Sequence, residues 1–279
     1  IKASGLAAGK GVIIAQNLDE AIKAVEDIMV DEKFGNAGSQ VVIEEFLDGV
    51  EASILSFTDS KVIVPLLSAK DHKKIGEDET GLNTGGMGVI SPNPFVTDEI
   101  FEKFKSDIME PTLKGMQSEG MDFAGVIFFG LMITKKGVYL LEYNMRMGDP
   151  ETQAVLPLLE NDLLELIEKS FDKKLSEVKV NWKPLHSCCV VAAAGGYPES
   201  YMKGDEITGV LDFKETNDNK VFICGAKVED GKLLTNGGRV LNAVALGNTL
   251  EEAQKKAYEL LKTINFEGMY FRKDIGGRF

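Results

Sequence analysis

Two side chains that could hold a metal ion stand at the end of an apolar run near the middle of the chain. Glu142 and Asn144 are two positions apart, and residues 138–144 have the apolar character of a β-strand. The period of two in a strand puts Leu140, Glu142 and Asn144 on one face. Carboxylate and amide oxygens suit Mg²⁺, which proteins usually hold with one or two carboxylates together with nucleotide phosphates and water. The pattern indicates a metal–nucleotide site, but a half-buried strand ending in the Gly-Asp-Pro turn of residues 148–150 also fits it.

A glycine-rich loop near the start of the chain has the residues of a phosphate cradle. Residues 1–3 and 11–15 are predicted as short strands, joined by Ser-Gly-Leu-Ala-Ala-Gly-Lys at residues 4–10. Glycines let backbone N–H groups approach phosphate oxygens, and Lys10 adds a positive charge. The loop is not a Walker A motif, which has a longer spacing, a Ser or Thr after the Lys, and a following helix. A phosphate-binding hairpin and an ordinary glycine-rich turn both fit these residues.

Acidic residues end the next predicted strand. Residues 40–46 have the pattern of a strand that leads into Glu-Glu-Phe-Leu-Asp-Gly-Val-Glu at residues 44–51. The backbone of such a strand can pair with the edge of an adenine ring, and a nearby Glu can accept hydrogen bonds from ribose hydroxyls. Solvated acids at the edge of a sheet are an equally simple interpretation.

Residues 68–94 are polar, rich in glycine and long for a simple connection, which favours a functional loop. The segment contains Asp-His-Lys-Lys at residues 71–74 and Asn-Thr-Gly-Gly-Met-Gly at residues 83–88. Basic side chains beside a run of glycine N–H groups can bind phosphate or carboxylate. His72 fits either a catalytic base or a solvated or structural histidine.

The elements that must position these residues can be predicted from caps and periodicity. Four helices are expected to follow the capping residues Asn17, Thr97, Asn161 and Thr249, and Pro111 is expected to bend or restart the second of them. Alternation and β-branched content predict further strands at residues 52–58, 61–67, 124–134, 187–194, 221–228 and 239–246.

Composition limits the class of protein. The chain has 279 residues, 44% of them hydrophobic, which is enough for one large or two moderate cores. A formal net charge of -13 without a Lys/Arg-rich run argues against nucleic acid or an anionic membrane as a partner. The apolar runs are too short to span a bilayer, and the three cysteines sit in apolar settings typical of free thiols in a reducing compartment. We expect a cytoplasmic protein, and because the chain opens directly with strand-like residues, we expect it to begin inside a domain.

A phosphate loop, an adenine edge and a metal carboxylate, in this order, are what an ATP site must supply. The sequence resembles the ATP-grasp superfamily and, within it, the phosphoribosylamine–glycine ligase family. The resemblance covers the whole chain and is carried by residues 2–12, 44–49, 71–73, 83–88, 146–153, 195–198, 235–240 and 272–276.

The resemblance implies an α+β fold in which two ATP-grasp lobes hold ATP between them, followed by a small C-terminal α+β domain. We expect residues 1–54 to form part of the small lobe, residues 55–185 the large lobe with the metal site, and residues 186–279 the C-terminal domain. The implied activity is the ATP-dependent ligation of glycine to 5-phosphoribosylamine in de novo purine biosynthesis. It would give glycinamide ribonucleotide, ADP and phosphate through glycyl phosphate, without a covalent protein intermediate.

The resemblance also implies roles for individual residues. Glu142 and Asn144 would bind Mg²⁺ or Mn²⁺, and Arg146 would act in catalysis. The residues implied for ATP are Lys2, Gly9, Lys10, Glu44, Glu45, Phe46, Leu47 and Glu51. Those implied for glycine and phosphoribosylamine are Asp71, His72, Lys73, Thr84, Gly85, Gly86, Met87, Asp149, Pro150 and Glu151. A monomer or weak homo-oligomer is expected, without nucleic acid or membrane as partner.

Several positions depart from the family pattern. Met147 stands where Leu or Phe is usual, and Ser4 where Asp is usual. The strand at residues 125–131 lacks the additional metal acid of many ATP-grasp enzymes, so a second metal held by two protein acids is not expected. The family normally has an N-terminal domain and more of the small lobe before Lys2, so we expect this chain to be inactive by itself. Another ATP-grasp carboxylate–amine ligase and a catalytically incomplete nucleotide-binding fragment are the alternative interpretations.

Overall fold

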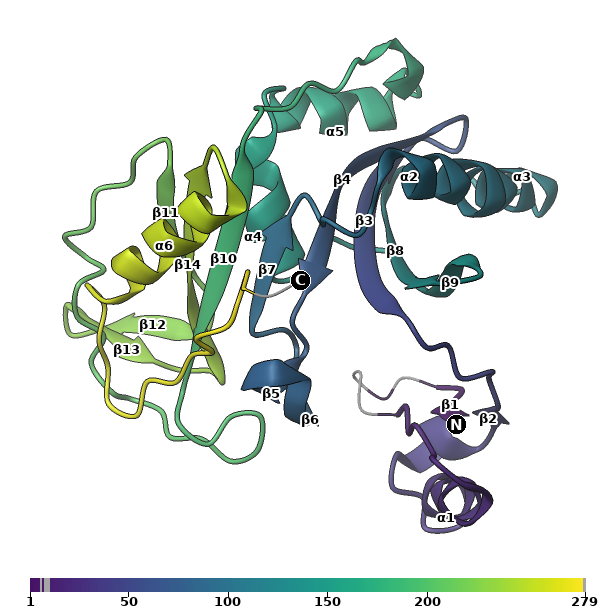
Figure 1. Ribbon diagram of the computed structural model, residues 1–279, viewed down its shortest axis with the longest axis horizontal. Helices are drawn as coiled ribbons and strands as arrows, with labels where there is room; N and C mark the ends of the chain where they lie inside the picture. The colour runs from purple at the N-terminus through teal and green to yellow at the C-terminus, as the bar shows by residue number, and fades with distance from the viewer. Residues whose placement is uncertain (6, 8–10, 278–279) are drawn as a thin grey trace. The chain divides into compact units, whose positions relative to one another are not determined.

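The computed structural model describes residues 1–5, 7 and 11–277. This part of the chain forms two compact units, Ile1–Asp48 and Gly49–Phe279 (Figure 1). Within the described ranges, no helix is both long enough and apolar enough to cross a membrane.

The first unit combines a small strand pairing with one helix. β1 (Lys2–Ala3) pairs antiparallel with β2 (Val41–Val42), and Lys2 also forms an antiparallel bridge with Val12. The predicted pairing between the two sides of the glycine-rich loop is therefore confirmed at this bridge. The strand predicted at residues 40–46 was too long, because the backbone beyond β2 leaves the pairing.

Helix α1 (Leu18–Met29) begins at the predicted cap. Asn17 Oδ1 accepts from the backbone N–H of Glu20 at 2.9 Å, and Glu20 Oε2 accepts from the backbone N–H of Gln16 at 2.8 Å. This reciprocal arrangement satisfies donors that the first helical turn leaves without partners. Ile28 is fully buried on the inner face.

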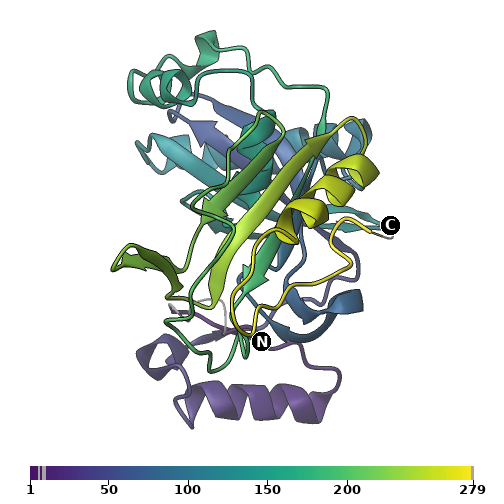
Figure 2. The ribbon, with the colours of Figure 1, turned by 90° about the vertical axis from the view of Figure 1, so that its left-hand side faces the viewer.

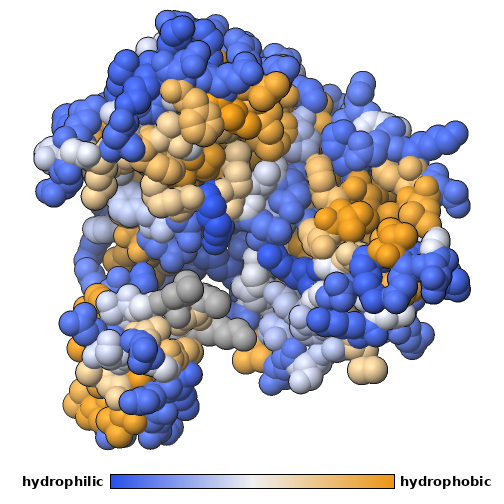
Figure 3. All heavy atoms as spheres, turned by 180° about the vertical axis from the view of Figure 1, so that it is seen from behind, coloured by the Kyte–Doolittle hydropathy of each residue, from blue (hydrophilic) through white to orange (hydrophobic). Residues whose placement is uncertain are grey.

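The outer face of α1 carries apolar side chains. Leu18, Ile22 and Met29 are exposed, and Figure 3 shows hydrophobic residues gathered on this unit. Within the unit, the helix is therefore covered on one face only.

In the second unit, within residues 49–277, eight strands form one antiparallel sheet in the order β11-β14-β10-β7-β4-β3-β8-β9 (Figure 1). The strands are β3 (Val50–Thr58), β4 (Ile63–Asp71), β7 (Gly88–Ser91), β8 (Gly125–Thr134), β9 (Gly137–Asn144), β10 (His186–Ala193), β11 (Asn219–Ile223) and β14 (Arg239–Gly247). Because β10 pairs with β7, strands from both sides of residue 185 share this sheet. The division into residues 1–54, 55–185 and 186–279 stays a prediction.

Two small hairpins accompany the large sheet. They are β5 (Lys74–Gly76) with β6 (Thr80–Asn83), and β12 (Ala226–Glu229) with β13 (Lys232–Thr235). The segment predicted as a functional loop, residues 68–94, contains strands, since it holds the end of β4, the first hairpin and β7. Short strands rich in glycine and charge give little periodic signal, which is why the sequence did not reveal them.

Helices cover both faces of the sheet. They are α2 (Asp98–Phe104), α3 (Glu110–Ser118), α4 (Glu151–Val155), α5 (Leu163–Phe171) and α6 (Leu250–Leu261). Figure 2 shows α6 lying across β10 and β14, where Ala257 and Leu261 are fully buried. The predicted cap of α6 is confirmed, since Thr249 Oγ1 accepts from the backbone N–H of Glu252 at 3.2 Å.

Two predicted helix details changed. The bend expected at Pro111 is a π-helical turn at Lys105–Met109 that joins α2 to α3, with Pro111 in the first turn of α3, where a missing N–H is tolerated. The cap of α5 is Asp162 rather than Asn161, because Asp162 Oδ1 accepts from the backbone N–H of Leu164 at 2.8 Å.

Candidate active site

The metal-binding residues predicted on β9 lie beside a β-bulge. Glu142 pairs with Gly130 and Asn144 with Phe128, but the next pair joins Leu140 to Leu131, so Leu141 is the extra residue. Residues directly opposite each other share a face, so Glu142 and Asn144 point to the same side, as predicted. The prediction that Leu140 shares this face was wrong, because the bulge interrupts the alternation.

Glu142 and Asn144 already contact each other. Asn144 Nδ2 donates to Glu142 Oε1 at 3.1 Å, and Arg146 Nη2 donates to Asn144 Oδ1 at 3.4 Å. A Cβ on Gly130 would lie 3.0 Å from Glu142 Cγ, so the glycine leaves room for the acidic side chain. The close carboxylate and amide fit a divalent cation as two of its oxygen donors.

The other donors for such a cation can be phosphate oxygens and water. The described residues contain no group of three or more His, Cys, Asp or Glu side chains placed to hold a metal ion. A pair of protein donors completed by phosphate oxygens and water is the usual arrangement for Mg²⁺ with a nucleotide.

Two buried carboxyl groups form the centre of the site. Asp71 ends β4, and Glu151 opens α4 with only 4% of its surface exposed. Burial, and then the charge of Glu151, raise the pKa of Asp71 well above its usual range. Burial also raises the pKa of Glu151, although Lys73 and a hydrogen bond from Ser53 Oγ at 3.3 Å oppose the shift. Within the described part of the chain, Asp71 Oδ1 is buried without a hydrogen-bond partner, which suits a carboxyl that receives a donor from a ligand.

Lys73 links this pair to the metal-binding strand. Its Nζ forms a 2.5 Å ion pair with Glu51 Oε2. Burial lowers the pKa of Lys73, but the charges of Glu51, Asp71 and Glu142 outweigh it, and the net shift is upward. The ammonium therefore stays charged among acids that belong to three strands or strand ends.

The segment between β6 and β7 folds over Asp71. Thr84 Oγ1 donates to Lys73 O at 2.8 Å and accepts from the backbone N–H of Gly86 at 2.9 Å. Gly86 has a φ of +114°, and a Cβ on it would lie 2.6 Å from Asp71 Oδ1. A glycine is required here by both the backbone conformation and the close approach of the carboxyl.

Arg239, at the start of β14, joins the two loops that carry the predicted substrate residues. Its Nη1 donates to Gly85 O at 2.7 Å and to Asp149 O at 2.8 Å, and it lies 3.2 Å from Asp149 Oδ1. Asp149 is followed by Pro150 through a cis peptide bond, which leads to Glu151 and α4. Sequence reasoning did not select Arg239, although its Asn-Gly-Gly-Arg turn, residues 236–239, was among the motifs of the resemblance.

Two residues from the predicted substrate set are not brought to this group. His72 points to the face of the strand opposite Asp71, is 3% exposed, and its Nδ1 donates to Gly88 O at 3.1 Å. Burial and the charges of Arg272 and Lys70 lower the pKa of His72 to about 4, so the ring is neutral at pH 7. Met87 is fully buried, and its backbone groups pair with His72 and Val191.

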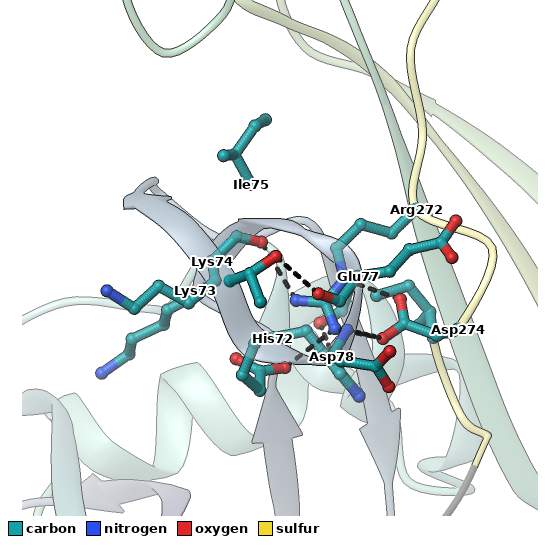
Figure 4. Close-up of polar contacts among 12 residues, drawn as sticks. His72, Lys73, Lys74, Ile75, Glu77, Asp78, Arg272 and Asp274 are labelled. Carbon is teal, nitrogen blue, oxygen red and sulfur yellow. Dashed lines mark hydrogen bonds and ion pairs between the residues drawn. The ribbon is translucent and has the colours of Figure 1, made fainter.

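A second arginine holds the first hairpin from the other side. Arg272 is 1% exposed, and it donates to Lys74 O at 3.0 Å, to both oxygens of Asp274, and to Glu79 Oε1 at 2.9 Å (Figure 4). Asp274 Oδ2 in turn accepts from the backbone N–H of Asp78 at 2.9 Å. This network, with Lys70 and His72, lines a cavity of about 380 Å³.

The predicted adenine and phosphate residues lie in the first unit, apart from Glu51 in β3. Lys2 is half-buried, Glu44, Glu45 and Phe46 are exposed, and Leu47 is half-buried. Gly9 and Lys10 lie outside the described residues. Residues 43–48 form no strand, so their backbone groups are free of sheet pairing in this unit.

The fold and these residues define an ATP-grasp protein. A family model described as phosphoribosylglycinamide synthetase, ATP-grasp (A) domain, matches residues 1–152, and a model of the C domain of the same synthetase matches residues 187–278. The chain belongs to the phosphoribosylglycinamide synthetase family. This confirms the family and the fold class expected from the sequence.

Individual relatives agree with this assignment. The chain is 59% identical to the phosphoribosylamine–glycine ligase of Fusobacterium nucleatum and 55% identical to that of Clostridium acetobutylicum. Each comparison covers 99% of this chain, and the chain spans 65% of the length of each relative.

Solved structures show the same likeness in three dimensions. The crystal structure of phosphoribosylamine–glycine ligase from Thermotoga maritima is 36% identical in sequence and has a TM-score of 0.89, covering 98% of this chain and 68% of that one. The biotin carboxylase domain of 2-oxoglutarate carboxylase from Hydrogenobacter thermophilus has a TM-score of 0.70 at 14% identity, covering 96% of this chain and 57% of that one. This second likeness shows the shared fold alone.

Proposed function

We propose that the protein containing this chain ligates glycine to 5-phosphoribosylamine with ATP, giving glycinamide ribonucleotide, ADP and phosphate. Family membership supports the reaction class. The observation in the chain that carries it is the pair formed by Asp71, whose Oδ1 is buried, and the buried Glu151. This pair lies beside charged Lys73, next to the exposed Glu142 and the half-buried Asn144. An amine-binding group thus adjoins a metal–nucleotide group, as a carboxylate–amine ligase requires.

The chemistry needs positioning and charge neutralisation more than a protein nucleophile. The glycine carboxylate attacks the γ-phosphate of ATP, and the amine of phosphoribosylamine then displaces phosphate from glycyl phosphate. We assign Glu142 and Asn144 to Mg²⁺ or Mn²⁺, which when bound would neutralise phosphate charge. Arg146, whose Nη1 donates to Met147 O at 2.9 Å beside this pair, is assigned to the transferring phosphate.

The other roles follow the positions of the side chains. We assign residues 44–47, Lys2, Gly9 and Lys10 to ATP, and Glu51 to its ribose. Glu51 pairs with Lys73, so ribose binding would have to compete with this ion pair. Asp71, Thr84, Gly85, Gly86, Asp149 and Glu151 are assigned to glycine and phosphoribosylamine.

The location and assembly of the protein belong to the same proposal. We propose a cytoplasmic enzyme that works as a monomer or weak homo-oligomer. The proposed location is supported by Cys188, Cys189 and Cys224, which are free thiols, as is usual for proteins in a reducing compartment. Sedimentation of the purified protein at several concentrations would measure the assembly.

The test is an ATP turnover assay on the complete gene product. Phosphate release should require both glycine and phosphoribosylamine, and the product should contain both substrates. Release that does not depend on glycine would contradict the proposal and favour another ATP-grasp ligase. Nucleotide binding without any turnover would favour a non-catalytic role.

A further inference from the structure

One nitrogen of the Arg239 guanidinium, Nη1, is fully occupied by contacts with protein oxygens. Nη1 donates to Gly85 O and Asp149 O and pairs with Asp149 Oδ1, at 2.7, 2.8 and 3.2 Å. These contacts hold the loop before β7 and the loop before α4 against the start of β14. The same nitrogen lies 3.5 Å from Gly86 O.

The other edge of Arg239 is available to a ligand. Among the residues that the structure describes, neither Nε nor Nη2 of Arg239 has a hydrogen bond or ion pair, and the side chain is 21% exposed. Nε–H and Nη2–H are parallel donors, and this fork matches the two oxygens of a carboxylate or phosphate. An arginine held firmly on one side with a free fork on the other is preorganised for such a group.

The missing side chain of Gly85 makes room for the guanidinium of Arg239. A Cβ on Gly85 would lie 2.9 Å from Arg239 Cζ, 3.0 Å from Nη2 and 3.1 Å from Nε. The guanidinium therefore lies against the bare backbone of Gly85, and any side chain there would push the fork away. Tyr197 Oη accepts from the backbone N–H of Gly85 at 2.9 Å and holds this backbone from outside.

The surroundings of the Nε–Nη2 edge indicate that its anion belongs to a substrate that also carries an amine. Gly86, whose carbonyl oxygen lies 3.5 Å from Arg239 Nη1, also packs against the carboxyl of Asp71, so the guanidinium lies close to this acid. A substrate that carries an oxyanion and an amine a few bonds apart fits acids on one side and a free arginine edge on the other. Glycine has its carboxylate beside its amine, and phosphoribosylamine has a phosphate and an amine on one sugar.

We propose that Arg239 binds a substrate oxyanion through its Nε–Nη2 edge while Nη1 holds the two substrate loops together. The inference rests on the proposed ligase function and adds a binding residue to it. The shared chemistry is a carboxylate or phosphate oxyanion, and the two substrates are its two possible sources.

The decisive variant is Arg239→Lys in the complete gene product. Lysine keeps a positive charge that can reach Gly85 O and Asp149 O, but it has no second edge. We expect the KM of one substrate to rise at least about tenfold, with the KM of ATP within about twofold of wild type. A rise for glycine identifies the carboxylate, and a rise for phosphoribosylamine identifies the phosphate. Unchanged KM values for both substrates would overturn the proposal.

A matched control separates binding from loop positioning. Tyr197→Phe removes the hydrogen bond on Gly85 N without touching the guanidinium, so it loosens the same loop. It should leave both substrate KM values within about threefold of wild type. An equal rise in Tyr197→Phe and Arg239→Lys would mean that Arg239 acts only as a loop clamp, and this would overturn the proposal.

Failure of the ligase function itself looks different. A wild-type protein that makes no glycinamide ribonucleotide contradicts the proposed function. A wild-type protein that makes it, together with an Arg239→Lys variant of unchanged KM, contradicts only the inference about Arg239. Thermal unfolding of each variant checks that the measured protein is folded.

Discussion

Arg239 and Arg272 both tie C-terminal parts of the chain to the segment that follows β4, but they do so in opposite ways. Arg272 is 1% exposed, and protein groups surround its guanidinium on several sides. Arg239 is held through one nitrogen and leaves a fork open. The two arginines therefore differ in whether donor groups remain for a ligand, and this difference is why we assign a binding role to Arg239 and a structural one to Arg272.

Removal of Arg272 should have the largest effect on stability. Arg272→Met leaves Asp274 and Glu79 without their partner and the backbone oxygen of Lys74 without its donor. We expect the free energy of unfolding to fall by about 3 kcal/mol, a value reduced from the fully buried case because both acids are partly exposed. Urea denaturation measures it. A loss below about 1 kcal/mol would show that Arg272 is not the structural counterpart of Arg239.

Glu142→Gln should show the reverse, a functional loss without a structural one. The amide removes the charge that attracts a divalent cation, so metal-dependent ATP affinity should fall at least about tenfold. The free energy of unfolding should change by less than about 0.5 kcal/mol, since Glu142 is exposed. Titration of the nucleotide with and without metal gives the affinity, and an unchanged value would remove Glu142 from the metal site.

The raised pKa of Asp71, beside the loops that Arg239 joins, makes the stability of the protein depend on pH. The pKa of Asp71 is raised in the folded state, so the folded protein holds its proton more tightly than the unfolded chain does. That contribution to stability is complete below the unfolded pKa near 3.8 and is lost as pH rises through the higher folded value.

Asp71→Asn should therefore weaken the fall of stability above pH 4 and stabilise the protein by about 1 kcal/mol at pH 8, while abolishing turnover. Chemical denaturation at a series of pH values tests this. An identical pH profile in the variant would mean that Asp71 is not a source of the dependence.

The smallest effect serves as a control for stability alone. Thr249→Ala removes the side-chain acceptor for the backbone N–H of Glu252 at the start of α6. We expect a loss of about 1 kcal/mol in unfolding free energy and no change in either substrate KM. A change in KM in this variant would mean that a loss of stability alone alters substrate binding. A KM change in Arg239→Lys would then no longer distinguish a binding arginine from a structural one.

Much of the fold could be predicted locally. The caps at Asn17, Thr97 and Thr249 appear where expected, because a polar side chain and the following turn are close in sequence. The bulge at Leu141 could not be predicted, since an extra residue in a strand is defined by its partner strand. For the same reason the sequence does not predict the small strands within residues 68–94, which are defined by the strands they pair with.

The candidate site divides along the same line. Residue types and their order along the chain by themselves determined the family, the pairing of Glu142 with Asn144 on one face, and the acids around residues 71 and 151. Only the tertiary structure decided that Asp71 and Glu151 are buried together, that His72 faces away, and that Arg239 reaches two loops with one edge left open. The physical reason is that local sequence specifies side-chain chemistry and strand direction, while burial and proximity depend on which distant segments pack together.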